Sequence, residues 1–193
     1  MHVSDLRHFL DLPEDAPASA RNLADHLGNI VRAATAGDPG TAWVSALPCR
    51  RSPGRSRCPG RIVVLRSELP PRIEWGCDTC EDEGVISGWE GTYLDLRESG
   101  AQHRIGDVAE IVISDEVAAA LRTLTLLDLG CERLVYQATG LDEGVALMAD
   151  EDQLDELVGY VAAEANHEPN RRRQQRLDRA LAVLSSALRE MAR

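Results

Sequence analysis

The chain has 193 residues, a formal net charge of −11 and a hydrophobic share of 44%. This length suits one ordinary domain with a small accessory module, or two small domains. No apolar run approaches the length of a membrane-spanning helix, and the first residues lack the apolar centre of a signal peptide, so we expect a cytoplasmic protein without a membrane partner.

The first part of the chain predicts two helices and a strand. We expect a short helix around residues 5–12, ended by Pro13, and a longer helix at residues 18–35, where apolar residues recur at spacings of three and four. Gly37 suits the end of the longer helix. Residues 41–48 have the composition of a strand that leads into the first of four clustered cysteines.

The middle of the chain predicts a small antiparallel ribbon. β-branched residues favour a strand at 61–66, the Pro-Pro pair at 70–71 suits a turn, and alternating apolar and polar residues predict a second strand at 72–75. A third strand is expected at 85–89, after an acidic run at 81–83 that is most simply a solvated turn.

The last part of the chain predicts a strand, a helix, two strands and two helices. Together with the helical start and the ribbon, this order is typical of an α+β protein. The expected elements are a strand at 110–113, a helix at 115–128 with Ser114 as its N-cap, strands at 134–138 and 144–148, and helices at 151–165 and 171–191.

Four of the five cysteines fall between residues 49 and 80. Cys77 and Cys80 are separated by two residues, a spacing that lets one turn point both sulfurs at the same centre. Cys49 and Cys58 are farther apart, so the intervening residues must loop out and return, and Pro53-Gly54 suits that reversal. Thiols stay reduced in the cytoplasm, which favours a metal over disulfides. The sequence therefore predicts a Zn²⁺ site with these four cysteines as ligands.

Two other interpretations of the cysteines stay open. They could be reduced thiols buried in the core, or they could hold an iron–sulfur cluster, since four thiolates also suit iron. If all four ligands of a zinc ion are sulfur, no position is left for an activated water. We therefore expect a structural rather than a catalytic metal.

On these four cysteines, residues 49–89 resemble the zinc ribbon class, in which loops of a small antiparallel sheet present two cysteine pairs. The resemblance implies an inserted β-hairpin held by the metal, and the widened first pair departs from the usual pattern. Residues 73–77 and 82–91 are also similar to small bacterial proteins of unassigned function. The expected domains are N-terminal helices and a strand at 1–48, a zinc-ribbon-like module at 49–91, and an α+β domain with a C-terminal helical pair at 92–193, which could form one compact unit with 1–48.

Arginine is concentrated in two islands of this acidic chain. Residues 49–76 hold seven Arg and two acidic residues, whereas residues 101–168 hold fifteen acidic residues and three Arg. Because the Arg fork makes paired hydrogen bonds with phosphate, the first island predicts nucleic-acid contacts from a loop that a metal anchors. Alternatively, its charges neutralise the acidic segment within the fold or across a dimer. The candidate contacts are Arg50, Arg51, Arg55, Arg57 and Arg61.

The second island lies at the start of the last helix, where cations oppose the helix dipole. We expect acidic partners from the preceding helix for its members, Arg171, Arg172, Arg173, Arg176 and Arg179. Apolar residues follow with heptad-like spacing over residues 177–191. This stripe is expected to dock on its own domain, and a homodimer or another protein partner is the second choice. Cys131 is expected to be a small core residue.

No sequence motif for catalysis is recognised, since the chain has neither a His-Glu-x-x-His nor a Gly-x-Ser-x-Gly motif nor a phosphate-binding glycine loop. The leading hypothesis is therefore a non-enzymatic zinc-binding protein that acts with nucleic acid as a regulator or accessory factor. A protein–protein adaptor or antitoxin-like subunit is the second hypothesis. An enzyme whose site forms only in the folded chain is the third.

Overall fold

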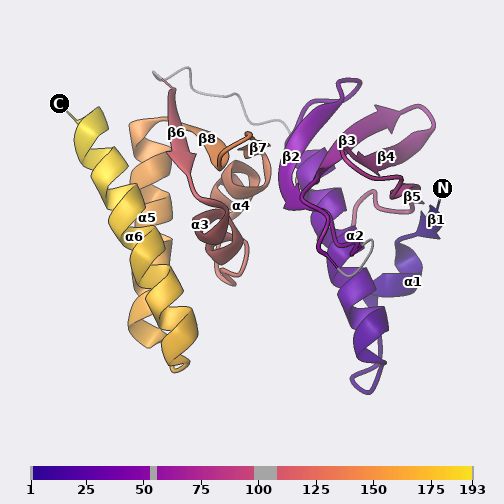
Figure 1. The fold of residues 1–193 in the computed structure, drawn as a ribbon, viewed down its shortest axis with the longest axis horizontal. Helices are drawn as coiled ribbons and strands as arrows, with labels where there is room; N and C mark the ends of the chain where they lie inside the picture. The colour runs from indigo at the N-terminus through magenta and orange to yellow at the C-terminus, as the bar shows by residue number, and fades with distance from the viewer. Residues whose placement is uncertain (1, 53–55, 98–107, 193) are drawn as a thin grey trace. The chain divides into compact units, whose positions relative to one another are not determined.

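The computed structural model describes residues 2–52, 56–97 and 108–192, and the chain divides into two compact units, Met1–Arg97 and Glu98–Arg193 (Figure 1). Each unit combines helices with a β-sheet. The mixed α+β class predicted from the sequence is therefore confirmed. Among the described residues, no helix is long and apolar enough to cross a bilayer.

The sheet of the first unit runs in the order β1-β5-β4-β3-β2. Neighbours from β5 to β2 are antiparallel, whereas β1 is parallel to β5. The interior strand β3 alternates buried and half-buried residues, as expected of a strand with one face on a core. The strands are β1 (His2–Asp5), β2 (Trp43–Pro48), β3 (Arg61–Glu68), β4 (Pro71–Cys77) and β5 (Glu83–Ser87).

Helix α2 (Ala18–Ala36) provides the other layer of the first core. Its buried face includes Leu27, Ile30 and Val31, and the helix contacts β3, whose Ile62 and Val64 are fully buried. A fully buried side chain of this size contributes about 1.5–3 kcal/mol by leaving water. The cysteine segment therefore shares its core with a helix from the first 48 residues.

The short helix expected around residues 5–12 is only partly present. Residues 2–5 form β1, and the helix α1 is limited to Arg7–Leu10. β1 lies beside β5 with Val3 opposite Val85, and the backbone N–H of Leu6 then donates to Ser87 O at 2.9 Å. This strand exists because a segment from the far end of the unit completes its hydrogen bonds, and no local sequence pattern encodes that partner.

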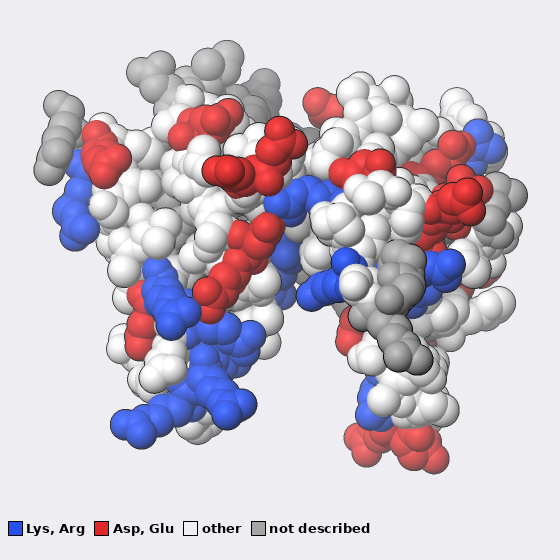
Figure 2. Space-filling view, in the orientation of Figure 1, with Lys and Arg blue, Asp and Glu red and all other residues white. Residues whose placement is uncertain are grey.

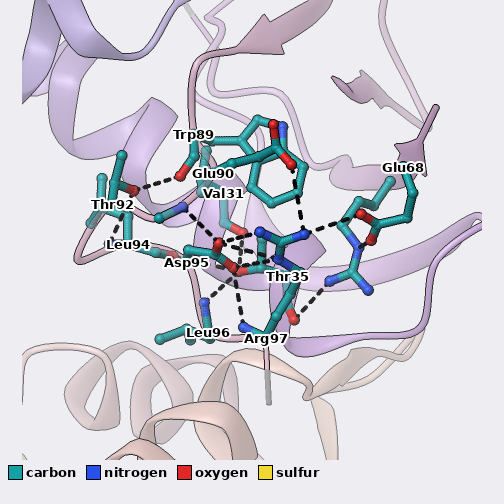
Figure 3. Close-up of polar contacts among 12 residues, drawn as sticks. Val31, Thr35, Glu68, Trp89, Glu90, Thr92, Leu94, Asp95, Leu96 and Arg97 are labelled. Carbon is teal, nitrogen blue, oxygen red and sulfur yellow. Dashed lines mark hydrogen bonds and ion pairs between the residues drawn. The ribbon is translucent and has the colours of Figure 1, made fainter. Parts of the chain in front are cut away.

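Thr35, at the C-terminal end of α2, fixes the last residues of the first unit (Figure 3). Its Oγ1 donates to Val31 O at 2.7 Å and accepts from the backbone N–H of Leu96 at 3.0 Å. Next to it, Arg97 binds Asp95 and Glu68 and places its guanidinium 4.6 Å from the centre of the Trp89 ring. The segment after β5 is therefore held to α2 and β3 by polar contacts.

The second unit has a smaller sheet in the order β7-β8-β6, with antiparallel neighbours. Its strands are β6 (Ala109–Ile113), β7 (Thr139–Gly140) and β8 (Val145–Ala149). Its helices are α3 (Asp115–Leu121), α4 (Leu129–Tyr136), α5 (Glu151–His167) and α6 (Arg171–Met191).

One predicted strand of the second unit is wrong. Residues 134–138 belong mostly to helix α4, and the helix predicted at 115–128 ends at Leu121. Asp128 starts α4 as its N-cap, since its carboxylate accepts the backbone N–H of Cys131 at 2.7 Å. The β-branched and aromatic run then becomes the buried face of a helix, because tertiary packing outweighs its strand propensity. The observed order is strand, two helices, two strands and two helices.

Helices α5 and α6 form an antiparallel pair (Figure 1). Leu177, Ala180 and Leu184 of α6 are fully buried, as are Leu154 and Leu157 of α5. α5 begins with a capping box in which Asp150 and Gln153 bind each other's backbone N–H groups. Leu177 and Leu184 of the stripe therefore pack within their own unit, whereas Leu181, Leu188 and Met191 are only half-buried.

Candidate metal centre

The four clustered cysteines meet at one end of strands β2, β3 and β4 in the first unit's sheet. Cys49 directly follows β2, Cys58 precedes β3, Cys77 ends β4, and Cys80 lies in the turn before β5. Since neighbouring strands here are antiparallel, the end of β2, the start of β3 and the end of β4 coincide in space. Strand pairing therefore brings together thiols that are far apart in the sequence.

The spacing of the sulfur atoms suits a tetrahedral metal. All four Sγ atoms lie within 4.8 Å of one another, and the Cys49–Cys80 and Cys58–Cys77 Sγ pairs are each 3.7 Å apart. A tetrahedron with metal–sulfur bonds of about 2.3 Å has sulfurs roughly 3.8 Å apart. A disulfide would require a separation of about 2.05 Å, and all four thiols are free. The cluster can therefore hold a metal ion.

Each sulfur of the cluster accepts a backbone N–H from the residue two positions further on. The donors to Cys49, Cys58 and Cys77 are the N–H groups of Arg51, Gly60 and Thr79, each at 3.4 Å. The N–H of Asp82 lowers the pKa of Cys80 in the same way. Hydrogen bonds to sulfur stabilise the thiolate, which is the form that binds a metal.

Burial acts against these hydrogen bonds. It raises the pKa of Cys49 to about 12, although the N–H of Arg51 lowers it, and burial also raises the pKa of Cys77. Four thiolates in one cluster would repel one another, so without a cation the cluster keeps protons. A divalent ion removes this cost because thiols deprotonate when they coordinate it. The donor set therefore fits a cation.

His26 of α2 packs beside the cysteine loops, which the sequence did not predict. Its ring stands edge-on to Trp75 with the ring centres 5.6 Å apart. Burial lowers the pKa of His26 to about 4, and the charge of Arg50 lowers it further, whereas Asp82 raises it. The ring is therefore neutral near pH 7.

Asp82 departs from the solvated turn expected at residues 81–83. Glu81 and Glu83 are exposed, but only 2% of Asp82 is exposed, and neither of its carboxylate oxygens has a hydrogen-bond partner among the described residues. Its nearest cation in an ion pair is Arg51, with Nε 4.0 Å from Oδ1. An acidic run gives no sequence signal that its central residue is buried.

The arginines of the first island surround the cysteines but do not share one environment. Arg50, Arg51 and Arg57 are exposed, whereas Arg61 is half-buried and its backbone N–H binds Asp78 Oδ1 at 2.9 Å. Arg55 lies outside the described residues. Three of the five predicted contacts are thus at the surface of the loop between Cys49 and Cys58.

Arginines also gather at the N-terminal end of α6 (Figure 2). Arg173 binds the carboxylates of Glu164 and Glu168 and donates to Thr123 O at 2.7 Å, while Arg179 is 2.9 Å from Glu116. The expected pairing with acids of the preceding helix is confirmed for Arg173, whereas the partner of Arg179 comes from α3. The other members of the island, Arg171, Arg172 and Arg176, are exposed.

A second group of possible metal ligands lies in the second unit. Ligand atoms of Asp128, Cys131 and Glu156 are within 4.8 Å of one another. Cys131 is buried as expected, and burial together with the two carboxylates raises its pKa to about 12. No sequence pattern indicated this group, because Glu156 belongs to α5 and is distant along the chain from Asp128 and Cys131 at the start of α4.

No family model, curated protein or solved structure matches this chain. Its function is therefore inferred from the geometry of its own residues.

Proposed function

We propose that the chain is a non-enzymatic zinc-binding protein whose first unit uses Cys49, Cys58, Cys77 and Cys80 as zinc ligands. The observation that carries this proposal is the 3.7 Å separation within two sulfur pairs from four different positions of the sheet edge. Zinc with four thiolates has this spacing. Reduced thiols of this kind suit a cytoplasmic protein.

The proposed role of the zinc ion is structural. Four sulfur ligands complete the coordination of the metal, so no position remains for a water or a substrate. The ion would connect the loop after β2 to the turn after β4. These segments lie at the ends of the strands, where the hydrogen bonds of the sheet stop. Metal binding then adds directly to the free energy of folding of this unit.

Elemental analysis of the purified chain tests the proposal. We expect one zinc ion per chain, loss of that ion in Cys77→Ser, and full retention in Cys131→Ser, which removes a thiol from the second unit. Iron in place of zinc, with the absorbance of a cluster, would assign the site to iron instead. Equal metal content in both variants would refute the ligand assignment.

A second proposed function is contact with nucleic acid through the loop between Cys49 and Cys58. The supporting observation is that the side chains of Arg50, Arg51 and Arg57 are all exposed beside the cluster. Contacts with phosphates give an affinity that falls steeply with salt concentration. Replacing Arg50 and Arg57 with Ala should weaken binding to mixed DNA and RNA at low salt, whereas Arg72→Ala, a change on strand β4, should not. A protein that binds neither, but retains a nuclease-resistant partner in a pull-down, would be an adaptor.

A further inference from the structure

Asp82 is an unusual buried acid. Its side chain is 1% exposed and neither oxygen has a hydrogen-bond partner among the described residues. Burying a carboxylate costs several kcal/mol unless a cation or hydrogen bonds compensate. Two other well-buried acids of the chain have such compensation, since Asp95 binds Arg97 and Glu168 binds Arg173. Asp82 therefore depends on the group that faces it, Arg51.

Arg51 and Asp82 occupy equivalent positions in the two halves of the cysteine cluster. The backbone of Arg51 touches both cysteines of the first half, because its N–H donates to Cys49 Sγ at 3.4 Å and its carbonyl accepts the N–H of Cys58 at 2.8 Å. The backbone of Asp82 touches both cysteines of the second half.

In that second half, the carbonyl of Asp82 accepts the N–H of Cys77 at 2.8 Å, and its N–H is hydrogen bonded to Cys80. The side chains of the two residues then meet, with Arg51 Nε 4.0 Å from Asp82 Oδ1. One ion pair thus joins the two segments that carry the four sulfurs.

We propose that Arg51 and Asp82 are a positioning pair that holds the two cysteine pairs at the spacing of the bound metal and sets how slowly the metal leaves. This inference rests on the proposed zinc site. The metal cannot escape until sulfurs from one half separate from those of the other, and that separation must also break the ion pair. Four thiolates carry more negative charge than a divalent ion can neutralise, so the metal complex is anionic. The positive charge of Arg51 also faces this anionic complex.

The rate of metal release from the metal-loaded protein into excess EDTA tests the pair. Groups that support metal ligands typically change affinity by 10–100-fold when they are replaced, so we expect Arg51→Ala and Asp82→Asn each to release metal about 10-fold to 100-fold faster. The double variant should release it no faster than the faster single variant, because either change alone breaks the pair. Arg51 is 58% exposed, so its variant keeps the buried core even if Asp82→Asn fails to fold.

Matched controls separate this role from a general effect of charge. Arg57→Ala removes a charge from the same loop, and Glu81→Gln removes an exposed charge next to Asp82. Both should release metal at the wild-type rate. The absorption spectrum of the cobalt-loaded Arg51→Ala protein should keep the bands of four sulfur ligands, which shows that no ligand has been lost.

Three results would overturn the positioning pair: release from Arg51→Ala that matches the controls, effects of the two single changes that multiply in the double variant, or slower release from Asp82→Asn. Each of these requires that the wild-type chain binds metal. A wild-type chain that binds none would instead overturn the proposed function itself.

Discussion

Cys49 and Cys80 are 31 residues apart in the chain, yet their Sγ atoms lie 3.7 Å from each other. Cys49 directly follows β2, and the two antiparallel strands β3 and β4 run out and back between the two cysteines. The contact between the two sulfurs therefore depends on the pairing of β2, β3 and β4.

The absence of a side chain at Gly60 should strengthen metal binding. A Cβ atom at this position would lie 2.5 Å from Cys77 Sγ and 2.5 Å from Asp78 Oδ1, far inside van der Waals contact. Cys77 cannot move away without leaving the cluster, so we expect Gly60→Ala to weaken metal affinity by at least about 10-fold. Competition with a chromogenic chelator measures this affinity.

The control for this change is Gly76→Ala in strand β4. A Cβ there would meet nothing closer than 3.8 Å, so its affinity should match that of the wild type. Equal affinities for Gly60→Ala and wild type would contradict the sulfur arrangement at Cys77.

Removing the metal should destabilise the first unit selectively. A ligand present at a thousand times its dissociation constant stabilises the folded state by about 4 kcal/mol. Because about 1 kcal/mol shifts the melting temperature of a domain of this size by roughly 4–8 °C, chelation should lower the first transition by well over 10 °C. Calorimetry with EDTA and with added zinc measures it. The transition of the second unit should stay in place, and a common shift of both transitions would argue against a metal held by the first unit alone.

The ionised carboxylate of Asp95 should stabilise the first unit near neutral pH, and this stabilisation should be lost in acid. Burial opposes ionisation of this carboxyl, but hydrogen bonds from Arg97 and from the N–H of Gly91 outweigh it, so the pKa of Asp95 lies below its ordinary value. A lowered pKa in the folded state stabilises the protein above the unfolded value of about 4. That contribution is lost as the pH falls through the lower, folded-state pKa.

Denaturant unfolding of Asp95→Asn and wild type at equal metal loading tests this pH dependence. Hydrogen bonds to charged groups contribute roughly 1.5–3 kcal/mol, so the variant should be less stable by up to about this amount at pH 7. The difference should shrink as the pH falls below about 4, the ordinary pKa of the unfolded carboxyl, and should be lost below the lower pKa that this carboxyl has in the folded state. A difference that is the same at every pH would show that the loss comes from packing rather than from charge.

Leu184 should stabilise the second unit through contacts within it. The residue is fully buried on α6, whereas its neighbour Val183 is 38% exposed. Leu184→Ala should lower the free energy of unfolding by about 2–5 kcal/mol, and Val183→Ala by much less. Chemical unfolding gives both values. The mass in solution should not change in either variant, and dissociation of a dimer by Leu184→Ala would instead place the stripe at an interface.

Much of the first unit could be predicted because its signals are local. Periodic apolar residues define α2, alternation defines β4, and the close spacing of Cys77 and Cys80 indicated one metal centre. The meeting of Cys49 with this pair was also predicted, since two strands joined by a turn separate them, and such an antiparallel ribbon returns the chain to its starting end.

The features that the sequence did not reveal depend on partners from distant segments. β1 is a strand because β5 lies beside it, and residues 134–136 are helical because Asp128 caps a helix that buries them. The burial of Asp82 between two exposed acids follows from the strand ends around it. Composition cannot encode these neighbours, so the pairing of Arg51 with Asp82 needed the folded chain.

Because β1 pairs with β5, the sheet of the first unit depends on residues 2–5 for its outermost strand. Residues 2–5 cover β5, the strand that follows the cysteine turn, so displacing them would leave backbone N–H and C=O groups of β5 open to pairing with another chain.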